Sequence, residues 1–187
     1  CDNTKLYLKE LKGRKSMAQI IMIEGIDRVG KTTLANMLRK DYGFKVFKDK
    51  SFYQNIDMYA SVEKVITFLE MVKQMDLTVI CDRSYLSEVV YSVADRHHSP
   101  IQAHMYFDII TNYIRNLMND GNLSVLLIYV KPSNINLSGK LHGCLQLKHN
   151  ELYDAYYDII GFDKKVCQWE TLGTTVKEIK EWSDKHA

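Results

Sequence analysis

The sequence predicts an α/β fold in which a central parallel sheet of about five strands carries helices on both faces. Strand-like and helix-like segments alternate from Ile20 to the end of the chain. The strand-like segments are continuously apolar, which is typical of strands buried on both faces. Such strands need crossover helices on each side of the sheet. The chain of 187 residues is long enough for one domain of this kind.

Five segments have the length and composition of buried strands. The run from Leu123 to Val130 is almost wholly apolar, which indicates a central strand, and Pro132 ends it. The predicted strands are residues 20–23, 44–47, 77–81, 123–130 and 166–169.

Helical stripes, with apolar residues three or four positions apart, separate these strands. Gly121 and Gly161 follow two of the stripes and predict helix ends there. The stripes are Leu34, Met37, Leu38 and Tyr42; Val62, Val65, Ile66, Leu69 and Val72; Tyr106, Ile109, Ile110, Tyr113, Ile114 and Leu117; Leu152, Tyr153, Tyr156 and Ile160; and a last helix from Val176 to Trp182.

The charge distribution separates residues 1–16 from the rest of the chain. This segment has five basic and two acidic side chains, so the remainder of a chain with net charge +2 carries one net negative charge. A long nucleic acid is therefore a poor partner for the body of the protein. We expect one domain over 17–187, preceded by an N-terminal extension over 1–16. That extension is consistent with a flexible segment, with a short amphipathic helix, or with translated upstream sequence that is not part of the native protein.

Cysteine usage and hydropathy predict a cytoplasmic protein without a membrane segment. No apolar run approaches the roughly 20 residues that span a bilayer, and the first residues lack a signal-peptide core. The four cysteines have no metal-binding spacing, so we expect reduced thiols. They are Cys1, Cys81, Cys144 and Cys167.

The segment from Gly25 to Thr32 matches the pattern G-x-x-x-x-G-K-[ST]. A strand precedes it and a helix follows, which is the context of a phosphate-binding loop. Glycines allow backbone N–H groups to surround an anion, and the helix N-terminus adds partial positive charge. The motif therefore predicts ATP and Mg²⁺ as cofactors. The expected nucleotide contacts are Gly25, Asp27, Arg28, Val29, Gly30, Lys31, Thr32 and Thr33.

A second charged segment, Asp82-Arg83, directly follows the third predicted strand. Ligands of open parallel sheets bind beyond the carboxyl ends of the strands, so this pair is expected at the same edge as the loop. Lys31 is expected to reach the β- and γ-phosphates, while Thr32 and Asp82 hold the metal ion. Arg83 offers a planar guanidinium for a phosphate.

These two segments resemble those of one enzyme family. The stretch from Glu24 to Thr33 is similar to the phosphate loop of thymidylate kinases, and Asp82 to Ser87, with Tyr91 beyond, is similar to their DR(Y)xxS segment. The resemblance implies a three-layer P-loop kinase fold that transfers the ATP γ-phosphoryl group to a deoxynucleoside monophosphate, dTMP or a related pyrimidine nucleotide. The polar stretch 133–149 is then a candidate lid.

The resemblance also implies roles for individual residues. Asp27 would contact the 3′-hydroxyl of the acceptor deoxyribose, and Arg28 would reach the γ-phosphate. The family subtype with this arginine lacks catalytic arginines in the lid, and no arginine follows Arg115 here. Arg83 would bind the acceptor 5′-phosphate. The predicted catalytic residues are thus Arg28, Lys31 and Arg83. The predicted acceptor site consists of Asp27, Phe47, Arg83, Ser87 and Tyr91.

Two departures from the family pattern leave other acceptors open. The family's FPxR-like segment is replaced by Phe47-Lys48-Asp49-Lys50, where Lys48 or Lys50 could substitute for the arginine. Ser84 is similar to the corresponding residue of deoxynucleoside kinases, which need a carboxylate base that only Asp49 could supply. The alternatives are a nucleoside kinase, a kinase acting on nucleic acid, and a nucleotide-binding module without transfer activity.

The remaining candidate residues favour structural interpretations. We expect a solvated face for the lid residues Lys140, His142, Lys148 and His149. The pair His97-His98 has no third ligand at a suitable spacing. Tyr153, Tyr156 and Tyr157 are expected in the core and at its edge. The resemblance also implies a possible homodimer through the apolar face between Tyr106 and Leu117.

Overall fold

The architecture is a five-stranded parallel sheet with strand order β2-β3-β1-β4-β5. A computed structural model describes residues 17–48, 58–95, 99–132 and 140–187, without the side chains of 58–59 and 140–146. Its elements are β1 (Ala18–Glu24), α2 (Lys31–Tyr42), β2 (Lys45–Phe47), α3 (Met58–Met75), β3 (Thr78–Asp82), α4 (Tyr85–Ala94), α5 (Pro100–Asn119), β4 (Leu123–Val130), α6 (Lys140–Ile159), β5 (Asp163–Cys167), the short 3₁₀ helix η2 (Trp169–Thr171) and α7 (Leu172–Lys185).

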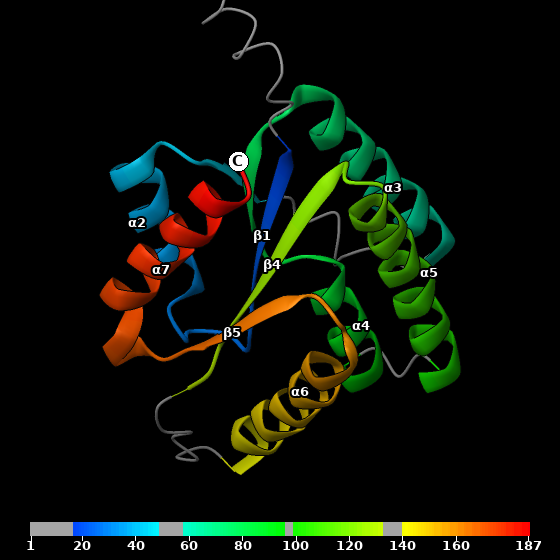
Figure 1. The fold of residues 1–187 in the computed structure, drawn as a ribbon. Helices are drawn as coiled ribbons and strands as arrows, with labels where there is room; N and C mark the ends of the chain where they lie inside the picture. The colour runs from blue at the N-terminus through cyan, green and yellow to red at the C-terminus, as the bar shows by residue number, and fades with distance from the viewer. Residues whose placement is uncertain (1–16, 49–57, 96–98, 133–139) are drawn as a thin grey trace, which may run out of the picture.

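Helices cover both faces of the sheet (Figure 1). Helices α2 and α7 pack together on one face, while α3, α4 and α5 lie on the other and α6 packs against α4. This arrangement confirms the predicted fold class. None of the helices in the described part of the chain is both long and apolar enough to cross a membrane.

The two central strands, β1 and β4, are buried along their whole length. Strand β1 pairs with β3 in a register that places Ile23 beside Asp82, and with β4 in one that places Glu24 beside Tyr129. The carboxyl ends of these strands therefore meet at one edge of the sheet, as the sequence predicted. That edge carries the candidate site.

The long helical region expected after Asp82 is divided into two helices. Helix α4 begins at Tyr85, where the Ser84 side chain accepts a hydrogen bond from the backbone N–H of Leu86 at 3.4 Å. Helix α5 begins at Pro100, whose missing N–H costs nothing in a first helical turn. Residues 96–98, which include the His97-His98 pair, lie outside the described residues.

The apolar face of α5 that was expected to be available for a homodimer is buried inside the chain itself. Tyr106, Ile110, Ile114 and Leu117 all lie in the core. Ile109 belongs to the predicted stripe but is 44% exposed, because it lies at the edge of the buried face. The exposed apolar residues of this helix are Ile101, Met105 and Ile109. A homodimer stays a prediction, but the buried face of α5 cannot be its interface.

Two other boundaries differ from expectation. The stretch predicted as a lid, 133–149, divides into residues 133–139, outside the described residues, and residues 140–149, which form the first half of α6. The last strand begins three residues earlier than predicted, at Asp163, because it is an edge strand whose exposed side chains give a weak apolar signal.

Candidate active site

The glycine-rich segment is a loop that connects β1 to α2, and its conformation requires glycine at two positions. Gly25 has φ +136°, and a Cβ atom there would lie 2.4 Å from the carbonyl oxygen of Val130. Gly30 has φ +102°, and a Cβ atom there would lie 2.7 and 2.9 Å from ring atoms of Trp169. Both contacts are too short for any side chain, so the two motif glycines follow from steric constraints.

Trp169 is an aromatic side chain beside the loop that sequence reasoning missed. It begins η2 directly after β5, and a capping box between Gln168 and Thr171 fixes this turn. Its side chain contacts the loop near Gly30 while remaining 55% exposed. An exposed aromatic surface beside a phosphate-binding loop is suited to stacking with a nucleotide base.

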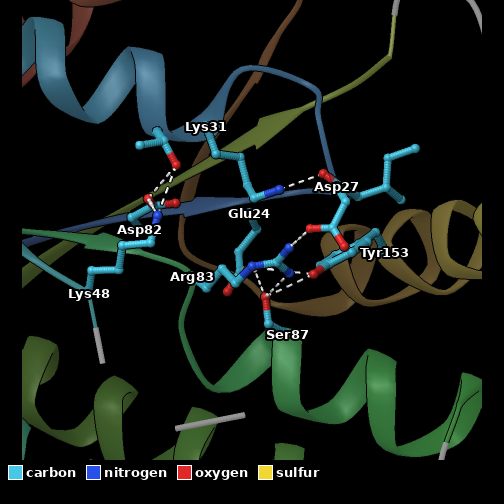
Figure 2. Close-up of polar contacts among 10 residues, drawn as sticks. Glu24, Asp27, Lys31, Lys48, Asp82, Arg83, Ser87 and Tyr153 are labelled. Atoms are coloured by element: carbon cyan, nitrogen blue, oxygen red, sulfur yellow. Dashed lines mark hydrogen bonds and ion pairs between the residues drawn. The ribbon is translucent and has the colours of Figure 1, made fainter. Parts of the chain in front are cut away.

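Lys31 lies at the centre of the site, and its side chain folds back over the loop (Figure 2). It is 6% exposed and its Nζ donates a hydrogen bond to the carbonyl oxygen of Ile26. Burial, and after it the positive charge of Arg83, lowers the pKa of Lys31 to about 8. Two cationic side chains therefore face the same small region, which favours an anionic ligand.

Thr32 and Asp82, the predicted metal ligands, lie on one side of Lys31. The Thr32 hydroxyl donates to Asp82 Oδ2 at 2.7 Å. Asp82 is 2% exposed and ends β3, whereas Thr32 lies in the first turn of α2. A hydroxyl and a carboxylate are the hard oxygen donors that Mg²⁺ prefers, and Mg²⁺ bound to a nucleotide needs few protein ligands. The two residues therefore fit the ion that the motif implies.

Lys48 lies against the same pair, a position that the sequence did not reveal. Its Nζ donates to Asp82 Oδ2 at 2.8 Å and to Thr32 Oγ1 at 3.1 Å. Lys48 was expected at most as a substitute for an acceptor-binding arginine. The other candidate for that role, Lys50, lies outside the described residues.

Arg83 lies on the opposite side of Lys31 with Asp27 and Ser87, two of the other predicted acceptor-site residues (Figure 2). Its guanidinium forms an ion pair with Asp27 and donates to Ser87 Oγ at 3.4 Å. It also lies 5.1 Å from the centre of the Tyr91 ring, within the range of a cation–π interaction. Arg83 itself has φ +82°, a conformation that costs a non-glycine residue about 1–3 kcal/mol.

Glu24 holds Arg83 in place indirectly, a role that was not predicted from the sequence. It is fully buried, and its Oε1 accepts hydrogen bonds from the backbone N–H and the hydroxyl of Ser84, each at 2.6 Å. Its Oε2 accepts from Ser87 Oγ at 2.5 Å and from the Tyr153 hydroxyl at 3.4 Å. Burial raises the pKa of Glu24, although the serine hydrogen bonds oppose this shift. The sequence feature that could have pointed to Glu24 is its position directly before Gly25, the first glycine of the loop.

Residues of α6 lie beside the Arg83 cluster. Tyr153 is buried, and its hydroxyl lies 2.9 Å from Ser87 Oγ, so the prediction of a core position is correct but incomplete. The prediction of a solvated face is wrong for His149, which is 7% exposed, lies 2.9 Å from Asp95 Oδ1 and has its ring centre 4.6 Å from that of Tyr91. Lys148 is exposed, whereas the side chains of Lys140 and His142 lie outside the description.

The other predicted contacts lie around the loop with different exposure. Arg28 is exposed at the loop tip with φ +65°, Val29 is buried, and Thr33 is exposed in the first turn of α2. The Phe47 ring stacks on Phe68 at a centre-to-centre distance of 4.4 Å, beside the core. Their roles in ligand binding stay predictions.

Comparison with known proteins identifies the fold. No family model matches this chain, and no curated protein matches it. The YorR protein of Bacillus subtilis, solved with phosphorylated GDP, matches with a TM-score of 0.62 at 20% identity, over 88% of this chain and 95% of that one. A deoxyadenosine kinase from M. mycoides matches with a TM-score of 0.56 at 17% identity, over 89% of this chain and 99% of that one.

A thymidylate kinase from Ehrlichia chaffeensis also matches, with a TM-score of 0.56 at 15% identity, over 88% of this chain and 98% of that one. Identities this low carry information about the fold alone. The chain therefore has the fold of the P-loop kinases, as its sequence resemblance implied.

Proposed function

We propose that this protein transfers the γ-phosphoryl group of ATP to a deoxynucleoside monophosphate, dTMP or a related pyrimidine nucleotide, and produces the diphosphate. The observation that carries the proposal is the pair of neighbouring cationic side chains, Lys31 at the end of the loop motif and Arg83 directly after β3. One cation is built into the phosphate-binding motif, and the other has its own aromatic and carboxylate neighbours. Two adjacent anion sites match a phosphate donor and a phosphate acceptor.

Three carboxylates at the loop already have hydrogen-bond or ion-pair partners, which supports a monophosphate acceptor. A nucleoside 5′-hydroxyl needs a base, whereas a phosphate acceptor is already an anionic nucleophile. Among the described residues at the loop, both oxygens of Glu24 accept hydrogen bonds, Asp27 is paired with Arg83, and Asp82 contacts two donors. None of these three carboxylates is held ready to take a proton from a hydroxyl, and Asp49, the base candidate named from the sequence, lies outside the described residues.

The side chains then act by positioning and by neutralising charge. Lys31 and the loop N–H groups would bind the β- and γ-phosphates, and Arg28 would extend over the γ-phosphate from the loop tip. Thr32 and Asp82 would hold Mg²⁺, which supplies charge neutralisation across the phosphates when bound. Arg83 would release Asp27 and bind the acceptor phosphate, which leaves Asp27 available to accept the 3′-hydroxyl hydrogen bond.

Trp169 supports a nucleotide as the phosphate donor. The loop binds the phosphates, and the adjacent exposed indole provides a stacking surface for the base. An inorganic phosphate donor would have no use for this surface. ATP is the donor we propose, with its base on Trp169.

A coupled ADP-release assay with Mg²⁺ and ATP tests the proposal. The acceptor panel contains dTMP, dUMP, 5-hydroxymethyl-dUMP, the other deoxynucleoside monophosphates, thymidine, deoxycytidine and an oligonucleotide. We expect turnover with a monophosphate and none with the nucleosides or the oligonucleotide. Turnover with only a nucleoside or only the oligonucleotide would instead support the alternatives that the Ser84 and Lys48 departures left open. Absence of turnover with every acceptor would favour a binding module.

A further inference from the structure

Lys48 places a positive charge at the pair of oxygens that would bind the metal ion. Strand β2 pairs with β3 so that Phe47 lies beside Cys81, and the next residues along the two strands are Lys48 and Asp82. The Lys48 ammonium contacts Asp82 Oδ2 at 2.8 Å and Thr32 Oγ1 at 3.1 Å. These two oxygens lie 2.7 Å apart, so all three atoms form a compact triangle (Figure 2).

The two partners of this ion pair differ in their access to solvent. The Asp82 side chain is 2% exposed and cannot leave the end of β3, whereas the Lys48 side chain is 46% exposed. A buried carboxylate needs a cation or strong hydrogen bonds nearby. A lysine on a flexible four-carbon stem can supply that charge and can also swing out into water. The geometry is that of an exchangeable counterion.

We propose that Lys48 and a divalent metal ion compete for the Asp82–Thr32 pair, and that Lys48 leaves the pair when the metal–nucleotide complex binds. The inference rests on the proposed function only in assigning Thr32 and Asp82 to the metal. A divalent ion at these oxygens and an ammonium within hydrogen-bond distance of both would repel each other strongly. One cation therefore replaces the other.

The test measures metal binding directly, by titrating the full-length protein with Mn²⁺ and following the free-ion electron paramagnetic resonance signal. The variant Lys48→Met removes the charge and keeps most of the stem. In wild type, Mn²⁺ must displace Lys48 from Asp82. An exposed ion pair contributes roughly 0–1 kcal/mol, and this pair should lie at the upper end because Asp82 is buried. We therefore expect the Lys48→Met variant to bind Mn²⁺ about three- to tenfold more tightly than wild type. The matched control is Lys45→Met, at the other end of β2, which makes the same change in net charge. It should leave Mn²⁺ affinity within about twofold of wild type.

Unchanged or weaker Mn²⁺ binding in the Lys48→Met variant would overturn the inference. So would equal tightening in the Lys45→Met control, since the effect would then be one of net charge. An Asp82→Asn variant must lose the Mn²⁺ site, and retention of that site would also refute the assignment. None of these measurements depends on turnover, so a failure of the proposed kinase activity is distinguishable from a failure of the exchange.

Thermal unfolding provides a second readout on the same proteins. In EDTA, the Lys48→Met variant should unfold at a lower temperature than wild type because Asp82 has lost its counterion. Saturating Mn²⁺ should then raise its unfolding temperature by more than it raises that of wild type. Equal Mn²⁺-induced shifts in the two proteins would contradict competition at this site.

Discussion

The buried carboxylate of Glu24 joins the phosphate-binding loop to Ser84 and helix α4, directly after Arg83. It accepts the backbone N–H and the hydroxyl of Ser84 and the hydroxyl of Ser87, at 2.5 to 2.6 Å. The backbone N–H of Arg83 also donates to Ile23 at 3.1 Å. These bonds hold Arg83 at φ +82° against its conformational preference. Replacing Glu24 should therefore damage both the fold and the acceptor site.

The magnitude follows from the donors that would lose their acceptor. In a Glu24→Ala variant, the three closest buried donors would lose this acceptor, at about 1–3 kcal/mol each before relaxation. Because hydroxyls can reorient toward other acceptors, we expect the free energy of unfolding to fall by about 3–5 kcal/mol. A Glu24→Gln variant keeps one oxygen, and Ser87 can turn to accept from the amide. Its loss should be about 1–2 kcal/mol.

Urea denaturation and initial-rate kinetics measure the two consequences. For Glu24→Gln, we expect the KM of the acceptor to rise about tenfold while the KM of ATP changes less than about threefold, since one misplaced charged contact is worth about 1.5–3 kcal/mol. A change in unfolding free energy below about 1 kcal/mol for Glu24→Ala would refute the network argument. Equal changes in both KM values would show that Glu24 does not act through Arg83.

The pH dependence of stability provides an independent check on Glu24. Burial raises its pKa in the folded protein above the unfolded value, so the folded state holds the proton more tightly. The resulting stabilisation is present below the unfolded pKa and is lost as pH rises through the folded pKa. The stability advantage of wild type over Glu24→Gln should therefore shrink from pH 4 upward. A constant difference would contradict the assigned direction.

Three further predictions concern other parts of the protein. Arg28→Ala should lower kcat by about 10³-fold or more and change the ATP dissociation constant by less than tenfold, because the proposed contact of Arg28 is with the transferring phosphoryl group. Losses of equal size in kcat and in ATP affinity would contradict that role. Trp169→Ala should weaken ATP binding about 5- to 150-fold in calorimetry, from a stacking contribution of about 1–3 kcal/mol, and leave tripolyphosphate binding unchanged; equal weakening of both ligands would indicate damage to the loop. Ile110→Ala should cost about 2–5 kcal/mol in urea denaturation and Ile109→Ala less than about 0.5 kcal/mol, since only Ile110 is fully buried; similar losses would show that α5 is rotated relative to the structure.

Local sequence patterns predicted most of the fold because its main signals are local. Continuous apolar runs identified the strands, and Leu34 and Leu38 identified the buried face of α2. The apolar stripe on α5 predicted a buried position for Ile109, which is 44% exposed. Apolar residues in the sequence mark a wider face of the helix than the face that packs against the core. Charged β5 has no apolar run, so its start was placed too late.

The site was predictable where it depends on a motif and hidden where it depends on tertiary contacts. The loop, Asp82 and Arg83 each lie at the end of a strand or directly after it, and could be assigned to one edge of the sheet. Glu24 contacts residues 60, 63 and 129 positions away, and no short pattern encodes such a network. The position of Lys48 depends on the register of β2 against β3, which only the pairing of whole strands determines.

The most direct measurement of the central claim is the calorimetric comparison of dTMP with thymidine, for wild type and for Arg83→Lys. If Arg83 binds the acceptor phosphate, wild type should bind dTMP at least about tenfold more tightly than thymidine, from a charged hydrogen-bond contribution of about 1.5–3 kcal/mol. The lysine variant should lose most of that difference, because an ammonium cannot form the paired contact. Equal affinity of wild type for the two ligands, or an undiminished difference in the variant, would contradict the account.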